Sequence, residues 1–170
     1  TTESPSGTLV DPIGPNPVSL FTPGDVGPYP VVVMVHGGAW VGGEPESMTA
    51  LADDLSDNAV VFNVTYRTLS QGSRFPGIVE DVACDVVAVA ERAGRYTTTP
   101  DNLIVVAHSA GAHLAALVAF APETFTCDGS VPEVDAFVGL AGPYDVTRLP
   151  ILNTMFGQTL DEAPELWASG

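Results

Sequence analysis

Runs of apolar, β-branched residues alternate along this chain with segments in which apolar residues recur every three or four positions. The run Val31-Val32-Val33-Met34-Val35 is apolar at every position, which is typical of a strand covered on both faces in a parallel sheet. Similar runs occupy residues 59–64 and 103–107, and a more mixed run occupies 134–140. These four runs predict the central strands of one sheet.

Residues 75–93, between the second and third runs, have helical periodicity. Apolar side chains recur along one side of this segment, whereas Asp81, Asp85 and Arg92 fall on the other side. A second helix is predicted directly after Ser109. Strands that alternate with helices form parallel βαβ units. We therefore predict an α/β fold with an open, mostly parallel sheet and helices on both faces.

The first 28 residues differ in composition from the rest of the chain. Proline and glycine are frequent there, and short strand-like pieces such as residues 18–21 lie between them, which predicts edge strands and turns. Residues 29–170 are expected to form the core. A chain of 170 residues is long enough for one ordinary domain and too short for two, so residues 1–170 are expected to form a single domain.

Charge is distributed very unevenly, because 21 acidic residues stand against five basic ones and the net charge is −16. This excess repels phosphate backbones and anionic surfaces, so we expect neither nucleic acid nor a membrane surface as a partner. No apolar run approaches the ~20 residues needed to span a bilayer. Salt screens self-repulsion, so a saline environment is a further hypothesis.

The chain has two cysteines, Cys84 and Cys127, without a C-x-x-C pair or a histidine at metal-ligand spacing. No metal site is therefore expected. The two residues are either free thiols or, in an exported protein, a disulfide. The sequence begins TTESPSG, which is typical of a mature or trimmed N-terminus. Localisation stays open, with a secreted or extracellular protein favoured.

Three loops of unusual composition follow predicted strands: HGGAW at 36–40, HSAG at 108–111 and GPYD at 142–145. Because the carboxyl ends of parallel strands share one edge, we expect these loops to lie together. The pattern A-H-S-A-G around Ser109 is one position from the G-x-S-x-G nucleophile elbow. A serine here also fits a helix cap, and HGG also fits a turn, but their order and placement together indicate acyl-transfer chemistry.

A serine hydroxyl becomes a catalytic nucleophile only when a base takes its proton and donors stabilise the oxyanion on the substrate. Paired glycines allow backbone N–H groups to converge on one point. We predict that Ser109 is the nucleophile and that Gly37, Gly38 and Ala110 supply the oxyanion hole.

Together, HGGAW, the elbow AHSAGAHLAAL and GPYD resemble the α/β-hydrolase superfamily, most closely small carboxylesterases of the hormone-sensitive-lipase and feruloyl-esterase-like groups. The stretch YRTLSQGSRFPGIVEDV also resembles a segment that joins two central strands in those enzymes. This resemblance covers about residues 28–168 and implies a compact or truncated α/β-hydrolase fold. It implies cleavage of short-chain or aryl esters through an acyl-enzyme on Ser109, without a cofactor or metal. Trp40 and Tyr144 are expected to line a substrate pocket, unless they cover a core edge.

The superfamily places an acid and then a histidine after the serine, but no histidine follows His113. His36 is expected to hydrogen-bond the backbone beneath the oxyanion loop, and the side chain of His108 is expected to diverge from Ser109. His113 lies one helical turn beyond Ser109 on the same side and is the candidate base. A core histidine satisfied by hydrogen bonds fits the same position.

No later carboxylate is assigned to the site. Asp145 looks structural in the resembling enzymes, and Asp161, Glu162 and Glu165 are expected on the solvated face of a terminal helix. Three interpretations stay open: a fragment of a longer esterase, a chain that recruits its base elsewhere, including from a second subunit, and a non-catalytic scaffold or binding domain. If these 170 residues are the whole molecule, the flank of the fourth strand is uncovered. An open hydrophobic edge favours pairing with another chain, so a homo-oligomer is then expected.

Overall fold

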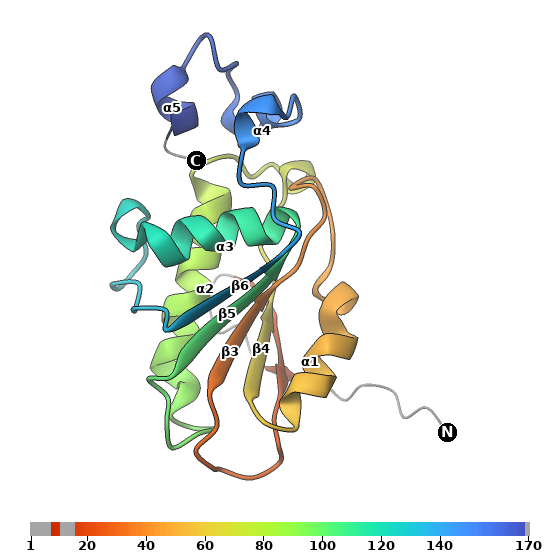
Figure 1. The fold of residues 1–170 in the computed structure, drawn as a ribbon, viewed down its shortest axis with the longest axis vertical. Coiled ribbons are helices and arrows are strands. Elements are labelled where there is room, and N and C mark those ends of the chain that lie inside the picture. The colour runs from red at the N-terminus through yellow and green to blue at the C-terminus, as the bar shows by residue number, and fades with distance from the viewer. Residues whose placement is uncertain (1–7, 11–15, 169–170) are drawn as a thin grey trace.

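The computed structural model describes residues 8–10 and 16–168 and has a six-stranded sheet at its centre (Figure 1). The strands are β1 (Thr8–Val10), β2 (Val18–Phe21), β3 (Val31–Val35), β4 (Val60–Val64), β5 (Leu103–His108) and β6 (Ala136–Leu140). The helices are α1 (Thr49–Ser56), α2 (Gly77–Ala93), α3 (Ala110–Phe120), α4 (Leu152–Phe156) and α5 (Pro164–Ala168). Short 3-10 turns lie at Pro45–Met48, Leu69–Gln71, Pro122–Thr124 and Val146–Arg148.

The central strands run parallel in the order β4-β3-β5-β6, and β2 and β1 continue the sheet in the antiparallel sense beyond β4. The predicted open, mostly parallel α/β sheet is therefore confirmed. Val35 at the end of β3 pairs with Ala107, and His108 at the end of β5 pairs with Leu140. The three strands thus end at one level, and the loops that follow them lie at one edge of the sheet.

Helices cover both faces of the sheet, with α2 and α3 on one side and α1 on the other (Figure 1). The strand residues alternate between these two layers. In β3, Val31, Val33 and Val35 belong to the larger core under α2 and α3, whereas Val32 and Met34 pack with α1. Burial on both faces explains why the strand is apolar at every position.

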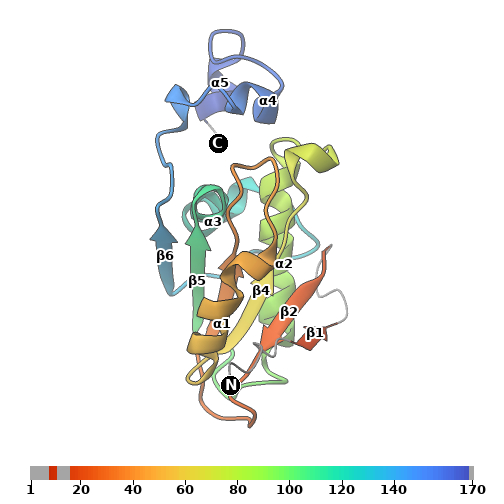
Figure 2. The ribbon, with the colours of Figure 1, turned by 90° about the vertical axis from the view of Figure 1, so that its right-hand side faces the viewer.

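The edge strands expected near the N-terminus are present where the structure describes them. β2 coincides with the strand-like piece at 18–21, and β1 pairs with its outer side. Figure 2 shows β1 and β6 at opposite edges of the sheet. Residues 1–7 and 11–15 lie outside the described residues, and the division of the chain into one domain stays a prediction.

Helix α2 corrects one expectation about polar side chains. Asp81 and Asp85 were expected on its outer side, but they are 3 % and 0 % exposed. Asp81 accepts hydrogen bonds from the backbone N and the guanidinium of Arg67, at 2.7 to 2.9 Å. A segment from outside the helix therefore covers this side of α2, which helical periodicity alone does not reveal.

The terminal helix is shorter than expected. It begins at Pro164, a residue whose fixed φ suits the first turn of a helix, so Asp161 and Glu162 precede it and only Glu165 belongs to it. The Glu162 carboxylate instead accepts hydrogen bonds from the backbone N and hydroxyl of Thr159, both at 2.8 Å. These bonds lower the pKa of Glu162.

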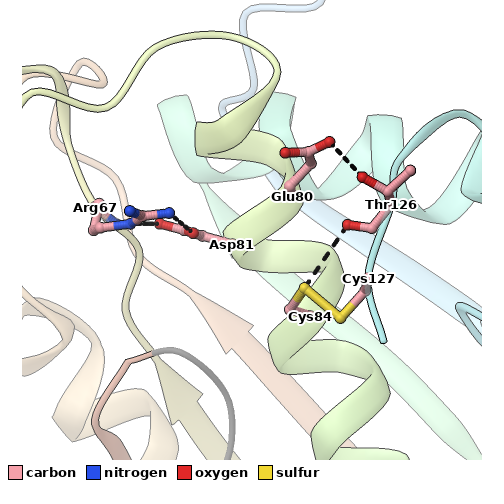
Figure 3. The surroundings of a disulfide bond; sticks show 6 residues. All are labelled: Arg67, Glu80, Asp81, Cys84, Thr126 and Cys127. Atoms are coloured by element: carbon pink, nitrogen blue, oxygen red, sulfur yellow. Dashed lines mark hydrogen bonds and ion pairs between the residues drawn. A yellow bond between two sulfur atoms is a disulfide. The ribbon is translucent and has the colours of Figure 1, made fainter. Parts of the chain in front are cut away.

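A disulfide joins Cys84 on α2 to Cys127 in the loop before β6, which decides between the two alternatives for these residues (Figure 3). Their Cα atoms are 5.3 Å apart. One turn earlier on α2, Glu80 accepts a hydrogen bond from the Thr126 hydroxyl at 2.8 Å. The loop is thus fastened to α2 at two adjacent points.

The segment with α4 and α5 lies beyond the carboxyl ends of the strands in both views (Figures 1 and 2). Phe156 of α4 contacts Trp167 of α5 within this segment and Phe75 outside it, so its ring connects the segment to the rest of the molecule. The centroid of Phe156 is 4.7 Å from Trp167 and 5.0 Å from Phe75, which precedes α2. Within the part of the chain that is described, no helix has the length and apolar character needed to cross a membrane.

Candidate active site

Ser109 occupies the sharp turn between β5 and α3. Its φ of 52° and ψ of −121° are sparsely populated by non-glycine residues, and such strained conformations cluster at functional sites. Its backbone N donates to Leu140 O at 2.8 Å, and its carbonyl accepts from Ala112 N at 3.0 Å. These bonds hold the turn between β6 and α3 and leave the side chain half-exposed.

Close packing at this turn explains why small residues surround the serine. A Cβ on Gly111 would overlap the carbonyl oxygen of His36. A Cβ on Gly37 would lie 3.0 Å from the Cβ of Ser109 and 2.9 Å from His108 Nδ1. The HGGAW loop therefore passes directly beside Ser109, as the register of the strands requires.

The HGGAW loop is wound tightly after β3. Gly38 has a φ of 132°, and Ala39 and Trp40 have φ values of 53° and 60°. The carbonyl of Gly38 accepts hydrogen bonds from Val41 N and Gly42 N, both at 3.1 Å. This winding holds the backbone of the loop next to Ser109, which is where an oxyanion hole requires its N–H groups. The roles of Gly37, Gly38 and Ala110 in such a hole stay predictions.

His36 supports the loop from below. Its Nδ1 lies 2.7 Å from the carbonyl oxygen of Gly37, and its Nε2 lies 3.0 Å from the hydroxyl of Thr65. A carbonyl only accepts, so Nδ1 carries the proton and Nε2 accepts from Thr65. Burial lowers the pKa of His36, which keeps this tautomer neutral at pH 7. The expected contact between His36 and the backbone of the loop is confirmed.

Tyr66 completes this support. Its ring stacks on His36 with centroids 4.5 Å apart, and its hydroxyl donates to the carbonyl of His36 at 3.1 Å. Burial raises the pKa of Tyr66, so the hydroxyl keeps its proton and remains a donor. The motifs in the sequence indicate no role for Thr65 and Tyr66, and their position directly after β4 is the signal from which a role could have been predicted.

His113 and Trp40 lie together in the interior. Each is 3 % exposed, and their rings meet edge to face with centroids 5.5 Å apart. His113 N donates to the carbonyl of Ser109 at 3.3 Å, so the link to the nucleophile candidate runs through the backbone. This burial fits the alternative expectations for the two residues: that His113 is a core histidine, and that Trp40 covers an edge of the core.

Tyr144 and Asp145 lie in the GPYD loop after β6. Tyr144 is 54 % exposed, and a Cβ on Gly139 or Gly142 would overlap its side chain. Asp145 accepts a hydrogen bond from the Thr147 hydroxyl at 2.6 Å, which stabilises the following 3-10 turn. The structural role expected for Asp145 fits this contact.

A cavity of about 260 Å³ opens beside the elbow. Its lining residues come from the segment after HGGAW and from the ends of β5 and β6: Ser47, Met48, Leu51, His108 and Leu140. The sequence does not single out Met48 and Leu51, because a spacing of three residues between apolar side chains is typical of any buried helix face. Among the described residues, no group of three His, Cys, Asp or Glu side chains could hold a metal ion.

The structure resembles solved structures of an esterase. The cyclosarin-phosphonylated esterase 2 of Thermogutta terrifontis superposes with a TM-score of 0.77 at 19% identity, covering 92% of this chain and 63% of that chain. Its propionate-bound form superposes with a TM-score of 0.72 at 18% identity, covering 90% of this chain and 62% of that chain. These similarities show that the chain has the α/β-hydrolase fold.

Several curated relatives are also named as esterases. A probable isoprenylcysteine alpha-carbonyl methylesterase of Arabidopsis thaliana is 31% identical over 142 residues, which cover 79% of this chain and 30% of the relative. The esterase LipQ of Mycobacterium tuberculosis is 29% identical over 117 residues, which cover 68% of this chain and 28% of the relative. The chain thus spans about a third of the length of these relatives. The BD-FAE family model matches residues 20–167, and the chain therefore belongs to the BD-FAE family.

Proposed function

We propose that the chain is a serine carboxylesterase that cleaves short-chain or aryl esters through an acyl-enzyme on Ser109. The observation that carries this proposal is the strained turn at Ser109 with the backbone of Gly37 packed against it. The esterase names of the relatives support the reaction class. No cofactor or metal takes part in the proposed chemistry.

In the proposed reaction, Ser109 Oγ attacks the ester carbonyl carbon while a base takes the hydroxyl proton. The carbonyl oxygen becomes an oxyanion, which the N–H groups of Gly37, Gly38 and Ala110 stabilise. Each such donor contributes about 3 kcal/mol to the transition state. The C–O bond to the alcohol then breaks, and the alcohol leaves with the proton. Water repeats the sequence on the acyl-enzyme and releases the acid.

Ester hydrolysis by the purified chain tests this proposal. We expect the chain to hydrolyse p-nitrophenyl acetate and butyrate, and Ser109→Ala to reduce the rate at least a hundredfold. Ser130→Ala is the matched control, because Ser130 is an exposed serine in the loop before β6. Equal rates for Ser109→Ala and the unaltered chain would favour the alternative of a non-catalytic binding domain. The same parts also hydrolyse amides, so an anilide belongs in the substrate series.

The proton acceptor is proposed to be an imidazole that reaches Ser109 from outside α3. His113 lies one helical turn beyond Ser109, but its ring is buried against Trp40. We therefore expect His113→Asn to lower the melting temperature and to leave the acylation rate per folded molecule within about twofold, and free imidazole to accelerate acylation of the unaltered chain. Loss of acylation in His113→Asn, rescued by imidazole in that variant alone, would instead make His113 the base.

A homo-oligomer is proposed from the outer edge of β6. Among the described strands β6 pairs with β5 alone, and its Val138 and Leu140 are 44 % and 39 % exposed. An open apolar edge is a template for pairing with another chain. Light scattering should show an oligomer that Val138→Lys dissociates and that Val26→Lys, at a valine that is 60 % exposed and lies outside the strands, does not. A monomer at all concentrations would contradict this assembly.

Secretion into a saline medium is proposed as the setting in which the chain works. The disulfide supports an oxidising compartment, and the net charge of −16 supports a medium in which ions screen repulsion. Both features are properties of the whole chain rather than of the site, so they can be tested independently of catalysis.

A further inference from the structure

We propose that the cavity beside Ser109 is the subsite for the apolar acyl chain of the substrate, and that Leu51 and Met48 set the length of chain it accepts. This inference rests on the proposed esterase function. The cavity lies between α1 and the ends of β5 and β6, and its volume is about 260 Å³.

Strand alternation places the cavity on the α1 side of the sheet. Ile104 and Val106 of β5 pack with the α1 layer, and the period of two places His108 on the same side. Leu140 of β6, paired with His108, joins it in the cavity wall. From the opposite side, Met48 and Leu51 close the space.

Two residues of the cavity wall adjoin the elbow. Leu140, which forms one wall, accepts a hydrogen bond through its carbonyl from the backbone N of Ser109, at 2.8 Å. His108, which forms another, directly precedes the serine and lies next to Gly37. We therefore expect the acyl chain of an ester bound at Ser109 to extend into this cavity.

The lining selects a neutral, apolar group. Met48 is 5 % exposed, and the partly buried Leu51 packs in the same cluster, so these two side chains form an apolar floor. The polar groups of the lining come from Ser47 and His108. The volume is just below the ~300 Å³ at which pockets for drug-sized ligands begin, which suits a short aliphatic chain or a single ring.

Phosphonylation rates of Ser109 with a series of methyl, butyl and hexyl fluorophosphonates test this assignment. Each methylene that enters an apolar site gains about fourfold in binding, so we expect the rate constant to rise with chain length until the cavity is full. Leu51→Trp fills the cavity and should reduce the hexyl-to-methyl rate ratio at least tenfold. Leu55→Trp is the control, because Leu55 is a half-buried leucine on α1 outside the cavity lining.

A second measurement keeps this inference separate from the esterase function. In Ser109→Ala, 2-octanone should bind saturably by NMR titration, and addition of Leu51→Trp should abolish that binding. A hexyl-to-methyl ratio of phosphonylation rates near one in the unaltered chain would overturn the acyl subsite. The same conclusion would follow if Leu51→Trp left that ratio unchanged. Failure of every probe to label Ser109 would contradict the esterase function, and absence of 2-octanone binding would then also overturn the subsite.

Discussion

The conformation of Ser109 depends on small neighbouring residues, which can be identified from the sequence motifs. The glycines could be predicted because the motif needs small residues, and the structure gives the physical reason: a Cβ on Gly111 would overlap the carbonyl of His36. The packing of His113 against Trp40 could not be predicted, because sequence spacing places a residue on one side of a helix without saying what covers that side. The candidate nucleophile was thus accessible from the sequence, and the surroundings of the candidate base were not.

Asp85 is a buried carboxyl group that the proposed reaction does not use. Burial raises its pKa to about 8, and the negative charge of Asp81 adds to the shift, while Asn16 opposes it. The folded state therefore keeps the proton to higher pH than the unfolded state, whose carboxyl ionises near pH 4. Because the folded state binds more protons between about pH 4 and 8, stability should fall as pH rises through this range.

Replacing this carboxyl group removes the pH dependence that it causes. Asp85→Asn should unfold at a higher urea concentration than the unaltered chain at pH 8 and at a similar concentration at pH 5. Asp54→Asn is the control, because Asp54 is an exposed aspartate on α1. Urea titrations at pH 5, 6.5 and 8 measure the effect. An equal slope of stability against pH in Asp85→Asn and the unaltered chain would contradict the account.

The central strands are the elements that the sequence predicts best. β3 occupies the residues expected, and β4 and β5 begin or end within one residue of the predicted runs, because burial on both faces demands continuous β-branched residues. The terminal helix was predicted less well. The charges of Asp161 and Glu162 do not indicate whether these residues lie in a helix. Pro164, rather than the charge pattern, determines where α5 begins.

The disulfide between α2 and the loop before β6 should contribute strongly to stability. It joins residues 43 apart in the sequence, and closing a loop of that size restricts the unfolded chain by about 4 kcal/mol in the chain-entropy model. Joint replacement Cys84→Ala and Cys127→Ala should lower the free energy of unfolding by about 2–4 kcal/mol. Urea unfolding measures this loss, and a reductant should destabilise the unaltered chain but not the double variant. A loss below 1 kcal/mol would show that the loop is held by its other contacts.

The whole molecule carries a charge that its own cations cannot balance, since five arginines face 21 acidic residues. Repulsion among these charges destabilises the compact state, and salt screens it. We expect the melting temperature to rise steadily between 0.05 M and 2 M NaCl. Sucrose is the control, because it favours burial of surface without screening charge. A melting temperature that is constant over this range would contradict the proposed saline setting.

The measurement that bears most directly on the esterase function is the intact mass of the 17.6 kDa chain before and after treatment with a methyl fluorophosphonate. We predict a gain of one phosphonyl group, which Ser109→Ala abolishes and Ser130→Ala does not. This result would show that Ser109 is the one serine of the chain that is activated as a nucleophile. An unchanged mass in a folded chain, with circular dichroism confirming the fold, would show that Ser109 is not a nucleophile in this protein.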